Sequence, residues 1–66
     1  SIKASYLLIE LYYDEDSTYR DVEKTISYAK QLFEATKDPE LAFLLGIVYD
    51  QQLKDYVKAV NWYENA

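Results

Sequence analysis

Apolar residues recur along the chain with the spacing of amphipathic helices, and the pattern predicts four of them. The first covers residues 2–14 and is apolar on nearly all sides, so it needs neighbours on more than one side. The second ends before Pro39, because the residue preceding proline disfavours helical backbone angles. The third ends near Asp50 and the fourth begins near Lys54. So short a connection forces these two helices to lie antiparallel. The predicted fold class is therefore all-α.

Each of the last three helices carries one apolar stripe with the helical spacing i, i+3 or i+4, i+7. The stripes consist of Val22, Ile26, Ala29 and Phe33, then Leu41, Leu44, Leu45 and Val48, and finally Tyr56, Ala59, Val60 and Tyr63. We expect the stripe of the second helix to be buried, and we expect the aromatic residues at repeat-core positions to serve in packing, namely Tyr12, Tyr28, Tyr49, Trp62 and Tyr63.

Polar residues that cap helices stand where the second and third helices begin. Asp38 can accept hydrogen bonds from the free N–H groups of the third helix. Pro39 suits its first position, where the missing N–H would have no partner. Ser17 or Thr18 is expected to cap the second helix, with Asp21 supporting its first turn.

The two halves of the chain resemble one another. Residues 4–12 overlay residues 41–49 at an offset of 37, with an aromatic residue, two leucines and a tyrosine coinciding. At an offset of 34, the second helices match Asp21, Lys24, Ile26 and Tyr28 with Asp55, Lys58, Val60 and Trp62. An offset near 34 is the period of helix–turn–helix solenoids. The prediction is one domain of two stacked hairpin repeats, residues 2–35 and 38–66, forming an α-solenoid segment of a longer array.

The second repeat can be compared with a known family. Residues 45–49 read Leu-Gly-Ile-Val-Tyr, and residues 55–66 read Asp-Tyr-Val-Lys-Ala-Val-Asn-Trp-Tyr-Glu-Asn-Ala. This pattern resembles the SEL-one-like repeat (SLR), a relative of the tetratricopeptide repeat (TPR), and implies a superhelix of α-hairpins that binds proteins. Gly46 and Ala59 are expected to let the two helices of the hairpin approach closely.

The chain departs from that family in three places. The family's loop glycines are missing between the third and fourth helices, where the loop is short and nearer in length to that of a tetratricopeptide repeat. In the first repeat Ile9 replaces the glycine and Thr25 replaces the alanine. We therefore expect the first hairpin either to splay or to repack.

Composition narrows the function classes. The net charge is −5, which gives no counterion-release drive toward nucleic acid and no attraction to anionic membranes. Histidine and cysteine are absent, which removes the commonest catalytic base, the thiolate nucleophile and the usual metal ligands. The acidic run 14–16 lacks the spacing and glycine of an EF-hand loop, and we interpret it as a solvated helix end. We expect neither an enzyme nor a cofactor.

The resemblance also implies a binding surface. In these families the first helix of each hairpin lines an inner, concave face that holds a peptide or a partner helix. Carried over from the framework leucines, this face contains Lys3, Tyr6, Glu10, Tyr13 and Asp14 in the first repeat, and Glu40, Phe43, Ile47, Asp50 and Gln51 in the second. We expect Tyr6 beside Phe43 as an aromatic floor flanked by carboxylates, an arrangement that suits protein binding. The alternative is that these aromatics pack on a neighbouring repeat or subunit.

The sequence thus predicts a non-catalytic protein–protein interaction module or scaffold. Its partner would be a protein or peptide, basic or of mixed charge, held on the concave face, and the exposed ends of the repeats would allow self-association. The alternative is a self-contained, small acidic helical regulator that inhibits a basic enzyme. An enzyme using carboxylates alone would need two acids converging in a pocket.

Overall fold

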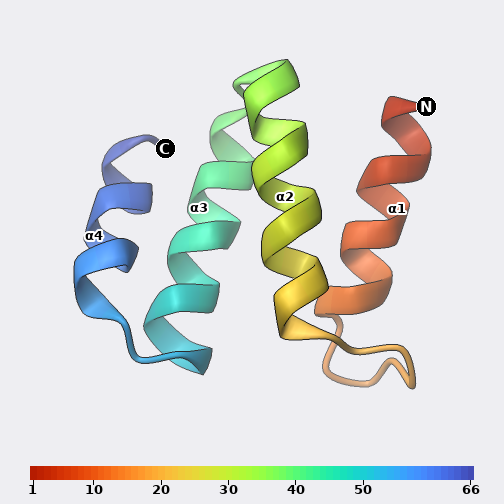
Figure 1. Cartoon of the computed structure of the whole chain (residues 1–66), viewed down its shortest axis with the longest axis horizontal. Helices are drawn as coiled ribbons and strands as arrows, with labels where there is room; N and C mark the ends of the chain where they lie inside the picture. The colour runs from red at the N-terminus through yellow and green to blue at the C-terminus, as the bar shows by residue number, and fades with distance from the viewer.

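The computed structural model describes all residues from 1 to 66 and contains four α-helices and no strand (Figure 1). The helices are α1 (Ile2–Tyr13), α2 (Val22–Thr36), α3 (Pro39–Ile47) and α4 (Tyr56–Glu64), and one π-helical turn, η1 (Val48–Gln52), continues α3. The predicted all-α fold class and the four predicted helices are confirmed. No helix is long and apolar enough to cross a membrane.

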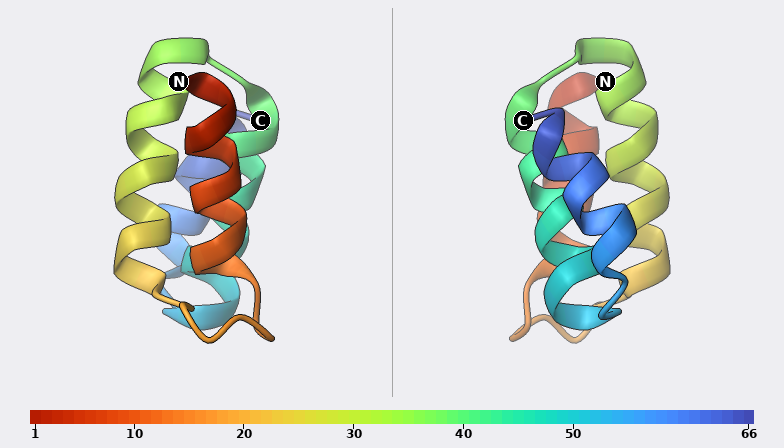
Figure 2. Two further views of the ribbon diagram at one scale, coloured as in Figure 1. Left: turned by 90° about the vertical axis from the view of Figure 1, so that its right-hand side faces the viewer. Right: turned by 90° about the vertical axis from the view of Figure 1, so that its left-hand side faces the viewer.

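The helices stand side by side in chain order, each antiparallel to the next (Figure 1). The backbone of α1 lies close to α2 alone, and α3 packs between α2 and α4. Seen from either end of this row, α2 and α3 lie on opposite sides while α1 and α4 lie between them (Figure 2). The molecule is flat, with extents of 28 × 25 × 14 Å. Both α1 and α4 therefore have a helix neighbour on one side only.

The buried core lies where the first three helices meet. Five of the nine buried apolar residues form one cluster there: Ile9 of α1, Ala29 and Leu32 of α2, and Leu41 and Leu45 of α3. The fourth helix joins through Trp62, whose ring meets the ring of Phe33 edge to face at a centroid distance of 5.4 Å. Aromatic pairs prefer this geometry to a face-to-face sandwich.

Both hairpins are closed by the same backbone hydrogen bond. The N–H of Asp21 donates to the carbonyl of Tyr12 at 2.9 Å, and the N–H of Asp55 donates to the carbonyl of Tyr49 at 2.8 Å. Tyr12 corresponds to Tyr49 and Asp21 to Asp55 under the two sequence offsets. The loops differ in length, yet each returns the chain to the same point beside the preceding helix.

A lysine lies over the ring of each of these two tyrosines, at equivalent positions of the two hairpins. Nζ of Lys24 lies 5.2 Å from the ring centroid of Tyr12, and Nζ of Lys58 lies 5.5 Å from that of Tyr49. Both distances are within the range of cation–π attraction. The two hairpins thus share a side-chain contact as well as a backbone contact.

The start of α2 differs from the prediction. Asp21 caps the helix by accepting a hydrogen bond from the N–H of Lys24 at 3.0 Å, whereas the Ser17 side chain accepts from Tyr19 inside the loop. The expectation that Ser17 or Thr18 caps α2 is wrong, because the bond between Asp21 and Tyr12 fixes where the chain can turn into the helix.

The predicted end of α3 and the predicted start of α4 also need correction. Helical structure continues through η1 to Gln52, beyond the predicted end at Asp50, with the Leu53 N–H donating to the carbonyl of Val48 at 3.2 Å. Lys54 has a left-handed φ of 55°, which stops a helix. The fourth helix therefore starts at Tyr56 and not near Lys54, after its capping residue Asp55. The predicted cap at Asp38 and first position at Pro39 are confirmed.

The first hairpin repacks around its larger residues. Ile9 is only 3% exposed and Ala29 is completely buried in the same cluster. Thr25 is also buried, and its hydroxyl donates to the carbonyl of Asp21 at 2.8 Å. A hydroxyl buried with a hydrogen-bond partner carries little desolvation cost, so threonine is tolerated at the position that corresponds to Ala59 of the second hairpin.

Candidate functional site

The ten residues expected on the binding surface all retain some exposure to solvent. These residues lie on α1, on α3 and on the short turns that follow the two helices, and we call the surface that they define the α1/α3 face. Lys3, Glu10, Asp14, Glu40, Phe43 and Gln51 are exposed, and Tyr6, Tyr13, Ile47 and Asp50 are half-buried. None belongs to the five-residue core.

Tyr6 connects α1 to the beginning of α3. Its hydroxyl donates a hydrogen bond of 2.5 Å to Oδ2 of Asp38, while Oδ1 of Asp38 accepts from the N–H of Glu40 at 2.9 Å. The bond from Tyr6 is the main reason that the pKa of Asp38 is lowered, and the bond to Asp38 is likewise the main reason that the pKa of Tyr6 is raised. The expected ring contact between Tyr6 and Phe43 is not formed.

Phe43 pairs with Tyr63 of α4 instead. Their ring centroids are 5.6 Å apart at an interplanar angle of 45°. The hydroxyl of Tyr63 donates to Oδ2 of Asp50 at 3.2 Å. Burial raises the pKa of Tyr63, and the bond to Asp50 raises it further. Phe43 remains 53% exposed, so an aromatic surface backed by Tyr63 is open to solvent.

A shallow depression of about 380 Å³ lies at the end of α1, lined by Glu10, Tyr13 and Asp14. Tyr13 is near enough to Tyr63 to contribute to the raised pKa of that residue. The three residues of the depression and Phe43 of the ring pair all belong to the α1/α3 face. This face thus carries both carboxylates and aromatic rings.

The carboxylates of the α1/α3 face have no cationic partner within the chain. The two ion pairs of the structure join Arg20 to Glu15 and Lys37 to Glu34, at 3.9 and 3.8 Å. Neither pair uses a carboxylate of this face. A cation supplied from outside would therefore meet carboxylates that no Lys or Arg already neutralises.

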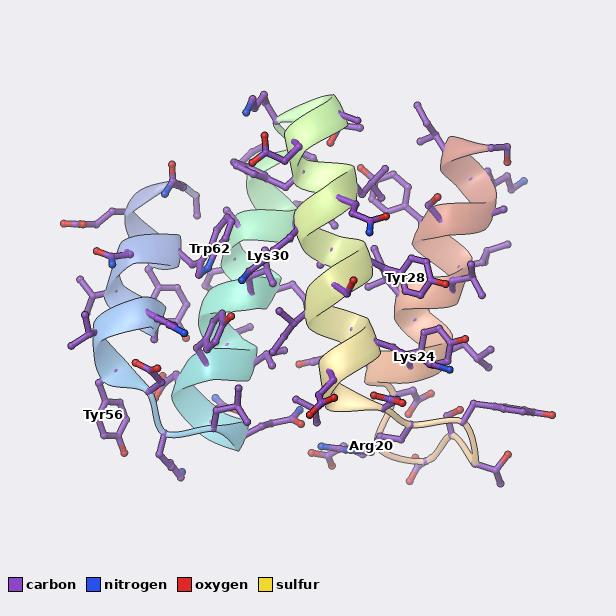
Figure 3. All side chains as sticks on the ribbon, viewed as in Figure 1. Arg20, Lys24, Tyr28, Lys30, Tyr56 and Trp62 are labelled. Carbon is purple, nitrogen blue, oxygen red and sulfur yellow. The ribbon has the colours of Figure 1, made fainter.

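Four lysines lie over aromatic rings, and one of them, Lys37 over Phe33, is also paired with Glu34. Lys24 lies over Tyr12, and both Lys30 and Lys58 lie over Tyr49. Figure 3 shows Lys24 and Lys30 extending from α2. Of the seven basic residues in the chain, only Lys3 belongs to the α1/α3 face. The acidic balance of the chain is therefore most pronounced on this face.

No cluster of three acidic side chains has the geometry to hold a metal ion. A second depression of about 370 Å³ lies between α1 and α2, but its lining contains no ionisable side chain except that of Tyr28. The chemistry available on the α1/α3 face is ion pairing, hydrogen bonding and aromatic contact. No family model, curated protein or solved structure matches the chain.

Two residues of this surface were missed by sequence reasoning. The sequence predicts a packing role for Tyr63, yet its ring also supports Phe43 and its hydroxyl donates a hydrogen bond to Asp50. The sequence predicts only a capping role for Asp38, yet its carboxylate also accepts a hydrogen bond from the hydroxyl of Tyr6. The position of Tyr63 opposite Gly46 was the available signal, because a glycine leaves room for a large ring to lie against its helix.

Proposed function

We propose that the chain is a non-catalytic protein-binding domain built from two α-solenoid repeats, of the tetratricopeptide or SEL-one-like kind. Two sets of contacts support the repeats: the loop-closing bonds at Tyr12 and Tyr49, and the lysines over the same rings. The side-by-side order of the helices is also typical of solenoids, in which each unit contacts only its neighbours.

The partner in this proposal is a basic peptide segment that lies on the α1/α3 face. The observation that carries it is the exposed ring of Phe43, held by Tyr63, on the same α1/α3 face as a depression whose carboxylates, Glu10 and Asp14, have no ion-pair partner. An aromatic contact with a polar rim is the usual composition of a binding surface. Lysine or arginine in the peptide would meet the carboxylates, and an apolar residue would meet the ring.

The test uses three labelled peptides of equal length and equal apolar content that are basic, neutral or acidic. Fluorescence anisotropy measures their affinity for the chain. We expect the basic peptide to bind most tightly and to lose affinity as salt rises, because screening shortens electrostatic range to about 10 Å at 0.1 M salt. Equal affinity for the acidic and basic peptides would contradict the proposal.

Substitutions locate the surface. Glu10→Gln with Asp14→Asn removes two charges and keeps the shapes, and we expect affinity for the basic peptide to fall about tenfold, since an exposed ion pair contributes up to about 1 kcal/mol. Phe43→Ala should weaken all three peptides. Glu34→Gln, on α2, is the matched control and should leave binding unchanged. If Tyr6→Ala and Phe43→Ala leave the affinity unaltered, the peptide binds elsewhere.

A further inference from the structure

The side of α1 that does not face α2 is apolar and exposed. Leu7 and Leu11, one turn apart, are 56% and 39% exposed, and Ala4 is exposed on the same stripe. Leucines usually lie inside, and a row of them on one helix forms a patch that needs explanation. No other helix of the chain covers these side chains, since the backbone of α1 lies close to that of α2 alone.

The opposite end of the row presents a second apolar surface. On α4, Val57 is 73% exposed, Val60 is 53% exposed and Tyr56 is 60% exposed. Figure 3 shows Tyr56 projecting from the outer side of α4, away from the other helices. The two ends of the molecule therefore both carry uncovered apolar side chains.

The exposed stripe of α1 has a buried counterpart on α3. Under the 37-residue offset, Ala4 corresponds to Leu41, Leu7 to Leu44 and Leu11 to Val48. Leu41 is 3% exposed and shares the core with α2, Leu44 packs against that core, and Val48 is completely buried. The exposed stripe of α1 thus has the position that α3 uses to pack on α2.

The exposed side of α4 likewise has a counterpart on α2. Under the 34-residue offset, Val60 corresponds to Ile26 of α2. Ile26 is half-buried and packs against the five-residue cluster, to which α3 contributes Leu41 and Leu45. The outer side of α4 thus has the position that α2 uses to receive α3.

We infer that copies of this chain stack head to tail, with α4 of one copy packing on α1 of the next as α2 packs on α3. The inference rests on the repeat arrangement proposed above but does not depend on peptide binding. Because the two surfaces differ, the contact is heterologous, and each added copy leaves one free surface of each kind. Growth therefore continues beyond a dimer.

Charge favours a second copy as the occupant. Within the chain, Lys30 and Lys58 both lie over the ring of Tyr49, at 5.6 and 5.5 Å from its centroid. At the junction between copies, the offsets put Glu64 in the place of Lys30 and Lys24 of the next copy in the place of Lys58. Two like charges are replaced by an opposite pair, which favours this register.

Solution mass at increasing protein concentration tests the inference. The unsubstituted chain should grow past the dimer. Leu7→Glu blocks the α1 surface and Val60→Glu blocks the α4 surface, so each variant alone should remain a monomer. An equimolar mixture should form a dimer and nothing larger, because one intact surface of each kind remains. Ser27→Glu, an exposed position of α2, adds the same charge and should assemble like the unsubstituted chain.

Charge reversal tests the register. Glu64→Lys and Lys24→Glu should each raise the dissociation constant of the junction, by about threefold to tenfold, and the double variant should restore much of it. A mass that stays monomeric at every concentration would overturn the inference, as would a single blocked variant that still dimerises. Circular dichroism of each variant checks folding. Peptide binding by a strictly monomeric chain would leave the proposed function standing and remove only the stacking.

Discussion

Gly46 of α3 faces the ring of Tyr63 in α4 so closely that a Cβ atom at Gly46 would overlap the ring. The ring is held from two other directions, by Phe43 and by the hydrogen bond from its hydroxyl to Asp50. It therefore cannot move aside without disturbing contacts of the α1/α3 face. The close approach predicted at Gly46 is confirmed, and the structure connects it to the candidate binding surface.

Gly46→Ala should destabilise the domain. Alanine favours helix by about 1 kcal/mol over glycine, but overpacking costs about 1–3 kcal/mol, so a net loss is expected. Urea unfolding measures it. In a Tyr63→Ala background the overlap is gone, and the same substitution should become stabilising. A stabilising effect in both backgrounds would show that the ring moves freely.

The two equivalent helix caps should have equal importance. Asp21→Ala and Asp55→Ala each remove a side-chain acceptor from the first turn of a helix, at 3.0 and 3.2 Å from the capped nitrogen. Each should lower the free energy of unfolding by about 1 kcal/mol. Ser17→Ala and Thr18→Ala are the controls and should change it by less than about 0.5 kcal/mol. A larger effect of Thr18→Ala than of Asp21→Ala would contradict the observed start of α2.

The helices, the cap at Asp38 and the close approach at Gly46 could be predicted because each depends on local spacing. The start of α2 could not. Ser17, Thr18 and Asp21 are all competent caps, and the choice is made by the bond between the Asp21 N–H and the carbonyl of Tyr12. That contact spans the whole loop and leaves no local signal in the sequence.

The candidate site was predictable as a set of positions but not as a set of contacts. The sequence offset places Tyr6 and Phe43 at equivalent points of two helices, but it does not say which neighbour each side chain reaches. Tyr6 extends to Asp38, before the first turn of α3, while Phe43 lies against Tyr63. Long aromatic side chains reach across helices, so their partners depend on packing and not on spacing alone.

The pair of Tyr6 and Asp38 should show in titrations. In the folded chain the pKa of Asp38 lies below its ordinary value, so this carboxylate contributes stability above its unfolded pKa and loses it as pH falls through the folded pKa. Tyr6→Phe removes the hydrogen bond that is the main cause. The pKa of Asp38, followed by nuclear magnetic resonance, should then rise toward the ordinary range, and acid unfolding should begin at higher pH.

At alkaline pH, the stability that Tyr6 contributes changes with pH in the opposite direction. The raised pKa of Tyr6 means that its neutral form is favoured by folding, so its contribution is present below the unfolded pKa and is lost as pH rises through the folded one. Tyr19 is 65% exposed and forms none of the ring pairs of the core, so Tyr19→Phe is the control. An unchanged Asp38 titration in Tyr6→Phe would mean that the hydrogen bond does not form in solution.

In the first hairpin the large and the small residue at the helix contact should have exchanged helices relative to the second. Ala29 holds the position that corresponds to Tyr63, and Ile9 holds the position that corresponds to Gly46, so the large residue has changed helices. Both are buried in one cluster. Ile9→Ala should cost about 2–5 kcal/mol by leaving a cavity, and Ala29→Ile should cost about 1–3 kcal/mol by overpacking. Combined, the two changes restore the total volume, and their cost should fall below the sum by about 0.5–3 kcal/mol.

Urea unfolding in a sulfate buffer, which strengthens apolar burial, keeps the weakest variant measurable. Ala35→Ile is the control, because Ala35 is exposed on α2 and should show no coupling to Ile9. Strictly additive costs for Ile9→Ala and Ala29→Ile would mean that the two side chains do not share one space. Coupling would show that the large side chain between the two helices of a hairpin can come from either helix. This would explain how two halves with different residues at these positions close through the same contacts at Tyr12 and Tyr49.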